Sequence, residues 1–288
     1  MITTSVALSW WEAILLGIVE GVTEYLPVSS TGHLTIVEKL LGMPIDDPGV
    51  VAFTAIIQIG AIVAAVIYFW SDIWRIATAW FRGLGSREER RNPDYTFGWG
   101  IILGSIPIAV VGLLFKDFIE TGLRSLYFVA GGLLLWSVVL WLADRREPQP
   151  GRTKSERGTS PLDAILIGTM QCVSLIPGVS RSGSTIAAGL LLGYDRVVAT
   201  RLSFFLGIPA LVAAGTLEAI TQFSAVSNTV GWTATIIGIV VSFICGYASI
   251  AWLLKFVSNH SFTSFIVYRI IIGVIIVLLV VSGLITAV

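Results

Sequence analysis

The stretch that decides the fold is GIVEGVTEYLPVSSTGHL, residues 17–34. It sets two glutamates, a histidine and a cluster of hydroxyls into otherwise apolar sequence. Ionisable side chains at membrane depth are costly and mark functional sites by default. A second stretch, GTMQCVSLIPGVSRSGST at residues 168–185, repeats the same order of polar and helix-breaking residues. Function is therefore expected where these two stretches lie.

The composition is that of a membrane protein. Hydrophobic residues make up 55% of the 288 residues and charged residues only 12%. A soluble domain carries about 25% charged residues, so this chain has too little polar surface to cover a water-soluble body. The formal net charge of zero excludes a nucleic-acid binder driven by bulk electrostatics. Two cysteines in apolar segments offer neither a disulfide framework nor a CxxC metal pattern.

Membrane-spanning helices need about 20 mainly apolar residues. Six stretches qualify, namely 51–70, 97–116, 126–142, 199–220, 231–254 and 266–287. Each motif stretch is instead interrupted by a proline, Pro27 or Pro177, and is expected to form two half-helices joined at a tight turn. Irregular backbone at membrane depth must be buried in protein or line a watery cavity. The predicted fold is thus an all-α polytopic membrane protein with six transmembrane helices plus two re-entrant helical hairpins.

Lysines and arginines concentrate in two predicted loops, 71–96 and 143–160, whereas 117–125 and 221–230 hold only Arg124. The positive-inside rule makes the two basic loops cytoplasmic. We therefore expect a multi-pass protein of the plasma membrane with both termini outside. The first hairpin would enter from outside and the second from the cytoplasm.

The two motif stretches align with one another after one residue is dropped and one inserted. The alignment pairs Gly17 with Gly168, Glu20 with Gln171, Pro27 with Pro177, Ser29 with Ser180 and Gly32 with Gly183. Each half is then a hairpin followed by three spans, and an odd number of spans gives the halves opposite topology. We predict repeat 1 at residues 1–143 and repeat 2, with its cytoplasmic linker, at 144–288, within one integrated membrane domain.

The first motif carries groups that can handle a cation and a proton. Glu20 and Glu24 are four residues apart, so on a helix they share one face. They can hold a hard divalent cation, share one proton, or pair with an Arg or Ser across the bundle. His33 lies one turn into the second half-helix, where its imidazole can reach the hydroxyls. Ser29, Ser30 and Thr31 can cap that half-helix, whose free N–H groups attract an anion.

The second motif contributes a cation for an anionic ligand. Arg181 keeps its charge permanently and matches phosphate oxygens in a bidentate way. The hydroxyls of Ser180, Ser182 and Thr185 surround it in sequence. Together the two motifs supply the groups that phosphoryl transfer needs, which are positive charge, an attacking hydroxyl or water, and a group that moves the proton.

EGVTEYLPVSSTGH from residue 20 and PGVSRSGST from residue 177 resemble the two signature regions of the undecaprenyl-diphosphatase family, the bacitracin-resistance type. The similarity extends through 58–61, 105–107, 112–117 and 268–271, and so over nearly the whole chain. The resemblance implies an enzyme that removes the terminal phosphate of undecaprenyl diphosphate. Its product is the monophosphate lipid carrier of cell-wall synthesis. The resemblance also implies a pocket open to the extracytoplasmic face and a divalent cation, Mg²⁺ or Ca²⁺.

Roles follow from the matching positions. The resemblance assigns Glu20 and Glu24 to the acidic, metal-binding motif, Ser30 and His33 to the hydroxyl–histidine motif, and Arg181 to phosphate binding. The expected substrate-binding hydroxyls are those of Ser29, Thr31, Ser180, Ser182 and Thr185. Our preferred hypothesis is that Ser30 attacks the terminal phosphorus with help from His33. Attack by His33 itself and attack by a water on the cation stay open as rivals.

Two other classes of protein are weighed against this interpretation. A polyprenyl-phosphate transporter or flippase would share the inverted-repeat architecture. A carrier of neutral or cationic cargo has no need for an Arg, two Glu and a His together with six nearby hydroxyls, whereas a flippase for the same lipid stays open, even as a second activity. The membrane phosphatases that use two histidines would require a second imidazole, and His260 falls in a predicted cytoplasmic loop. The sequence leaves open the prenyl chain length, the identity of the cation, and whether the protein is a monomer or a homodimer.

Overall fold

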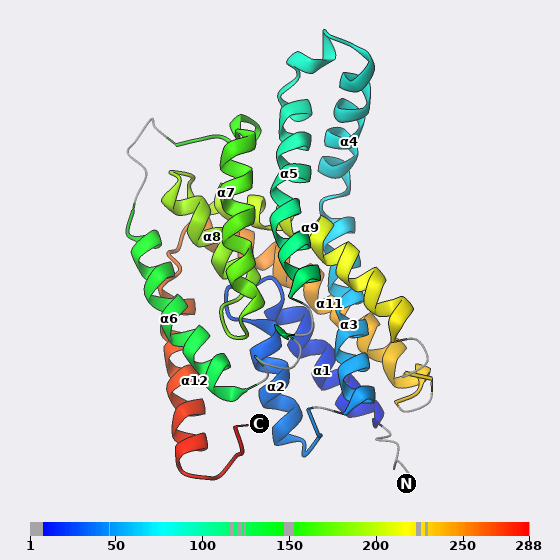
Figure 1. The fold of residues 1–288 in the computed structure, drawn as a ribbon, viewed down its shortest axis with the longest axis vertical. Helices are drawn as coiled ribbons and strands as arrows, with labels where there is room; N and C mark the ends of the chain where they lie inside the picture. Colours follow the sequence, from blue (N-terminus) through cyan, green and yellow to red (C-terminus); the bar gives the residue numbers. More distant parts are fainter. Residues whose placement is uncertain are drawn as a thin grey trace. The chain divides into compact units, whose positions relative to one another are not determined.

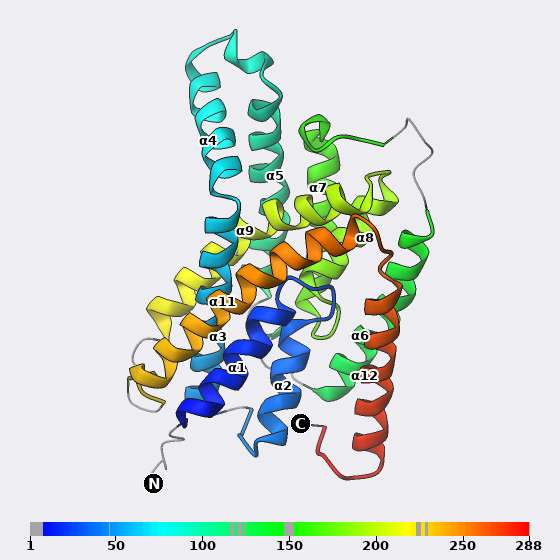
Figure 2. The ribbon, with the colours of Figure 1, turned by 180° about the vertical axis from the view of Figure 1, so that it is seen from behind.

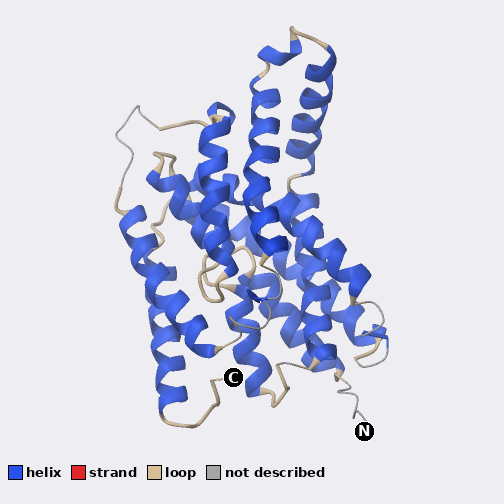
Figure 3. Ribbon diagram, viewed as in Figure 1, coloured by secondary structure: helices blue, strands red, loops and turns tan. Residues whose placement is uncertain are grey.

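The computed structural model describes residues 8–287 except 46, 116–117, 120–122, 124, 147–152, 223–225 and 228–229. Arg124 and parts of the 112–117 and 143–160 stretches therefore lie outside the described residues. Within the described part of the chain, the regular structure is helical and contains no strand (Figure 3). The predicted all-α class is confirmed.

Six helices are long and apolar enough to cross a membrane (Figure 1), and they confirm the six predicted spans. They are α3 (Pro48–Tyr68), α5 (Pro93–Leu114), α6 (Leu126–Asp144), α9 (Arg196–Thr221), α11 (Trp232–Val257) and α12 (Thr263–Val281). Several begin before the apolar run does, because a polar cap and a proline fix the first turn. Asn92, for example, accepts a hydrogen bond from the backbone N–H of Asp94 at the start of α5.

Each motif stretch forms two short helices separated at its proline, as the sequence predicts. The first motif gives α1 (Trp10–Thr23) and α2 (Ser30–Leu40), which pack against each other. The second gives α7 (Pro161–Gln171), the 3₁₀ turn η4 (Cys172–Leu175) and α8 (Arg181–Leu191), and α7 packs against α8. These helices have 11 to 14 residues, which is too short to span a bilayer.

The predicted loop at 71–96 is wrong. Most of it is helical, as α4 (Trp70–Gly85) followed by the 3₁₀ turn η1 (Glu89–Arg91), and α4 lies side by side with α5 in both views (Figures 1 and 2). Ile76, Ala79 and Gly83 form the buried face of α4. A search for continuous apolar sequence misses this helix, because Asp72, Arg75 and Arg82 interrupt its apolar residues.

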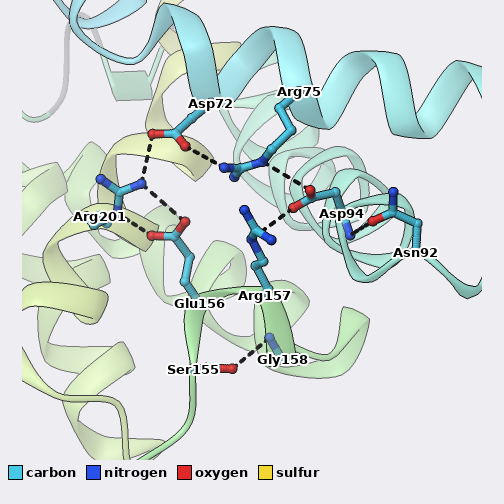
Figure 4. Close-up of polar contacts among 9 residues, drawn as sticks. All are labelled: Asp72, Arg75, Asn92, Asp94, Ser155, Glu156, Arg157, Gly158 and Arg201. Carbon is cyan, nitrogen blue, oxygen red and sulfur yellow. Dashed lines mark hydrogen bonds and ion pairs between the residues drawn. The ribbon is translucent and has the colours of Figure 1, made fainter.

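Arginines of the two basic stretches bind acids as well as facing solvent. A network of six charged residues connects α4, α5, the 3₁₀ turn η3 (Glu156–Gly158) and α9 (Figure 4); its members are Asp72, Arg75, Asp94, Glu156, Arg157 and Arg201. Arg201 Nη2 donates to Asp72 Oδ2 at 2.9 Å, and Arg75 Nε lies 3.0 Å from Asp94 Oδ2. The network fastens residues 155–157 to the α4–α5 helix pair.

The chain divides into two compact units. The first unit comprises Met1–Leu26, Ser30–Tyr68 and Leu211–Trp252, and the second comprises Pro27–Ser29, Phe69–Ala210 and Leu253–Val288. This division follows packing density and is a different property from the predicted boundary between repeats.

Glycines of the two motifs lie at close helix contacts in each unit. In the first unit, a Cβ added to Gly17 of α1 would lie 2.7 Å from the Gly238 carbonyl oxygen of α11. In the second unit, a Cβ added to Gly168 of α7 would overlap the Gly104 carbonyl of α5. Small residues let helix backbones approach closely in membrane proteins, where packing drives helix association. The aligned pair Gly17 and Gly168 therefore has the same packing role in both motifs.

Candidate functional site

The end of α1 and the start of α2 bring a carboxylate and a hydroxyl together in the first unit. Glu20 and Glu24 are buried, with 1% and 6% of their surface exposed. The Ser30 hydroxyl donates a hydrogen bond of 2.7 Å to Glu24 Oε2, and the Gln58 amide of α3 donates to the same oxygen at 3.5 Å. A carboxylate that accepts the proton of a serine hydroxyl can act as its base.

His33 and Thr31 occupy the first turn of α2. His33 is half-buried and lies three residues after Ser30, so the two side chains share a face of the helix. Thr31 is exposed, and its carbonyl accepts a hydrogen bond from the Thr35 hydroxyl. The imidazole and the carboxylate of Glu24 are thus both candidates for moving the proton of Ser30.

Two serines hold an unusual positive φ. Ser29 has φ 76° and Ser180 has φ 79°, and they are the non-glycine residues with positive φ in the described chain. Such conformations cost about 1–3 kcal/mol each in non-glycine residues and persist at sites where surrounding structure enforces them. The two serines are aligned in the sequence repeat, and each directly precedes a helix, α2 or α8.

The second motif forms a hydroxyl cluster at the start of α8. Ser180 Oγ accepts a hydrogen bond from the Gly183 N–H at 3.1 Å and lies 3.1 Å from Ser182 Oγ. The Thr185 hydroxyl contacts Ser203 Oγ of α9 at 2.8 Å. The hydroxyls of Ser180, Ser182 and Thr185 are thus ordered by bonds within the first turn of α8 and to α9.

Arg181 lies against α9 in the same unit. Its Nη1 donates to the carbonyl oxygen of Ser203 at 3.0 Å, and its guanidinium packs on Gly207, where any side chain would collide with it. The guanidinium is half-buried beside the hydroxyl cluster. This arrangement places a permanent positive charge next to the start of α8.

A second arginine, Arg269 of α12, has none of its surface exposed. Its guanidinium donates to five acceptors, which are the carbonyl oxygens of Pro27, Gly132, Leu133 and Gly178 and the hydroxyl of Ser137. Pro27 belongs to the turn before α2, and Gly178 belongs to the turn before α8. One side chain therefore joins the turns of both motifs within the second unit.

The acidic pair suits a cation that also takes ligands from substrate. Among the residues that the structure describes, no three His, Cys, Asp or Glu side chains gather into a metal-binding group. Glu20 and Glu24 offer two buried carboxylates on one helical turn. Mg²⁺ commonly binds one or two carboxylates and completes its shell with water and substrate phosphate. The donors fit a cation of that kind.

Sequence reasoning gave no role to three residues that the structure brings to these groups, Gln58, Ser203 and Arg269. Gln58 and Arg269 are polar residues inside apolar spans, and that isolation is a signal that could have found them. Ser203 looks like an ordinary small helix residue, so the sequence gives no sign of its contact with Thr185.

His260 is exposed after α11, and its ring stacks on that of Phe256 with 4.5 Å between the ring centroids.

A multi-pass helical membrane protein with a buried acidic pair, a serine bonded to it, and arginines at two strained serine turns belongs to a recognisable class. These features define a class of helical membrane protein with buried ionisable side chains. The chain belongs to the family described as bacitracin resistance protein BacA, whose sequence profile matches residues 13–275.

Curated relatives are similar over their full length. An undecaprenyl-diphosphatase of Cutibacterium acnes is 58% identical over 287 residues, covering 97% of this chain and 100% of the relative. Undecaprenyl-diphosphatase 3 of Frankia casuarinae is 55% identical over 276 residues, covering 96% and 98%. Undecaprenyl-diphosphatase 1 of Corynebacterium jeikeium is 45% identical over 291 residues, covering 100% of both. The family resemblance expected from the two motifs is confirmed.

Proposed function

We propose that this protein is an undecaprenyl-diphosphatase. It hydrolyses undecaprenyl diphosphate to undecaprenyl phosphate and inorganic phosphate, which recycles the lipid carrier for peptidoglycan synthesis and confers resistance to bacitracin. Family membership and the names of the relatives support this function. The observation that carries it is the 2.7 Å hydrogen bond from Ser30 Oγ to Glu24 Oε2, because it joins a potential nucleophile to a potential base.

In the proposed reaction, Ser30 Oγ attacks the terminal phosphorus while Glu24 or His33 takes the hydroxyl proton. The new Oγ–P bond forms as the bond from phosphorus to the bridging oxygen breaks, and undecaprenyl phosphate leaves. Water then attacks the phosphoserine, releases inorganic phosphate and restores the Ser30 hydroxyl. The burial of Glu24 favours this role, because bulk water is kept away from its carboxylate and does not displace the Ser30 hydroxyl from it.

The groups proposed to bind phosphate lie at helix starts, that of α2 in the first unit and that of α8 in the second. Arg181 supplies fixed positive charge, and hydroxyls and backbone N–H groups supply donors. The hydroxyls proposed for this role are those of Ser29, Thr31, Ser180, Ser182 and Thr185. The Gly183 N–H bond to Ser180 Oγ supports it, because that bond orders the first turn of α8.

Glu20 and Glu24 would hold a divalent cation, Mg²⁺ or Ca²⁺. When bound, such an ion neutralises charge on the phosphoryl oxygens. The burial of both carboxylates supports this role, since two adjacent buried anions repel one another unless a cation or a proton offsets their charge.

We further propose that the α1–α2 and α7–α8 pairs are re-entrant hairpins in an inverted-topology repeat, with residues 1–143 and 144–288 as its halves. The matching φ angles of Ser29 and Ser180 and the matching close packing at Gly17 and Gly168 support this arrangement. The protein would lie in the plasma membrane with its site open to the extracytoplasmic side, as a monomer or a homodimer.

A phosphoenzyme trap tests the proposed chemistry. Purified protein is mixed with undecaprenyl diphosphate labelled at the terminal phosphate, quenched in acid and digested, and the labelled peptide is identified. Label on Ser30 supports the mechanism, label on His33 replaces the nucleophile, and release of phosphate without any label favours direct attack by water. Movement of lipid across vesicles without release of phosphate would favour a flippase.

A further inference from the structure

Arg269 occupies an unusual electrostatic position. It is fully buried in a spanning helix, and its five acceptors are four carbonyl oxygens and one hydroxyl. Among the residues that the structure describes, no carboxylate is bonded to it. A buried cation without an anionic partner is costly, so it is retained where its charge or its geometry is used.

The contacts are directed at the two motif turns. Nη1 donates to the Pro27 carbonyl at 2.9 Å, and Nη2 donates to the Gly178 carbonyl at 3.0 Å. The turn containing Gly178 also packs directly on α6, where a Cβ added to Gly132 would lie 2.8 Å from the Gly178 carbonyl carbon. Each turn ends at a strained serine, Ser29 or Ser180, whose conformation the turn must enforce.

We propose that Arg269 is a positioning residue for the phosphatase reaction, an inference that rests on the proposed function. Its planar guanidinium fixes the Pro27–Ser29 turn relative to the Pro177–Ser180 turn within the second unit, so that Ser29 and Ser180 are held in fixed positions for the substrate phosphates. Its charge, balanced by carbonyl dipoles, adds to the attraction for the diphosphate. Arg269 does not touch the substrate.

Two substitutions separate geometry from charge. Arg269→Lys keeps the charge but has one ammonium in place of the forked guanidinium, so it cannot reach both turns. We expect kcat to fall about tenfold to a hundredfold, because small misplacements of catalytic groups have effects of that size, whereas KM changes by less than about threefold. Arg269→Met removes the charge as well, and KM for undecaprenyl diphosphate should then rise.

The measurement uses monodisperse protein in detergent, with kcat and KM for undecaprenyl diphosphate determined beside the thermal midpoint. Arg196→Lys is the matched control, because Arg196 Nε bonds the Asp144 carboxylate at 2.6 Å in the same unit but contacts neither turn. The control should lower the thermal midpoint and leave kcat and KM unchanged. A purely structural Arg269 would behave like the control, and that result would overturn the proposal.

A milder variant decides the question if neither Arg269 variant folds. Ser137→Ala removes the acceptor of Arg269 Nε, which lies 3.2 Å from Ser137 Oγ, and leaves the guanidinium in place. We expect folded Ser137→Ala protein to have a lowered kcat, and an unchanged kcat would contradict the proposal. Wild-type protein that releases no phosphate would instead remove the proposed function itself.

Discussion

Ser29 and Ser180 share a positive φ, 76° and 79°, at equivalent positions of two separate motifs. Glycine adopts this conformation without steric cost. Serine at both positions therefore indicates that the side chains are needed and that stability is given up to keep them.

The first prediction separates stability from activity at Ser180. Ser180→Gly should keep or raise the thermal midpoint, because relief of the strained φ offsets the lost cap, and glycine caps only a few tenths of a kcal/mol less well than serine. Its rate of phosphate release should fall, since the hydroxyl is gone. Ser180→Ala keeps the strain and loses the cap, so it should lower the midpoint by the equivalent of about 1 kcal/mol. A Ser180→Gly protein with full activity would show that the hydroxyl has no role.

The second prediction concerns the contact between α5 and α7. Gly168→Ala would force a methyl group into the Gly104 carbonyl, and we expect a loss of about 1–3 kcal/mol of stability or a failure to fold. Gly131→Ala on α6 is the matched control, because nothing lies within 4 Å of its added Cβ. Thermal unfolding in detergent distinguishes them, and equal midpoints would mean that α5 and α7 are not in close contact.

The third prediction is a pH dependence at Asp163, which lies in the first turn of α7 and outside the six spanning helices. Burial alone would raise the pKa of Asp163, but hydrogen bonds from Lys154 and Tyr194, each 2.9 Å long, and the charge of Lys154 hold it below its ordinary value of 3.8. The tyrosine remains a donor, because burial raises the pKa of Tyr194.

A lowered pKa in the folded state stabilises the protein above the unfolded-state pKa, and this contribution is lost as pH falls through the folded-state pKa. Wild-type protein should therefore exceed Asp163→Asn in thermal midpoint at about pH 7, and the difference should shrink towards about pH 3. A difference that does not depend on pH would mean that the carboxylate charge of Asp163 contributes nothing.

Sequence reasoning succeeded where one physical property decides the structure. Continuous apolarity located the six spans. Pro27 and Pro177 located the breaks in the motif helices because serine and glycine follow each of them closely, whereas Pro107 and Pro209 lie inside α5 and α9. It failed at α4, where the helix is amphipathic and its buried face becomes visible only through contact with α5.

The candidate site was predictable in composition but not in connections. The burial of Glu20 and Glu24 follows from charged residues in apolar sequence, and the structure adds that Glu24 bonds Ser30. The contacts of Arg269 join residues of four separate segments, and no local pattern encodes a contact between Pro27 and Arg269. Such links depend on tertiary packing, which a single sequence does not display.

Release of inorganic phosphate from undecaprenyl diphosphate by the purified protein tests the central claim most directly. Wild-type protein should release phosphate, Ser30→Ala should be slower by about 10³-fold or more, and Arg181→Ala by about 10²–10³-fold. Ser258→Ala, an exposed serine after α11, serves as the control and should retain full activity. Folded Ser30→Ala and Arg181→Ala proteins that release phosphate at the wild-type rate would contradict the account.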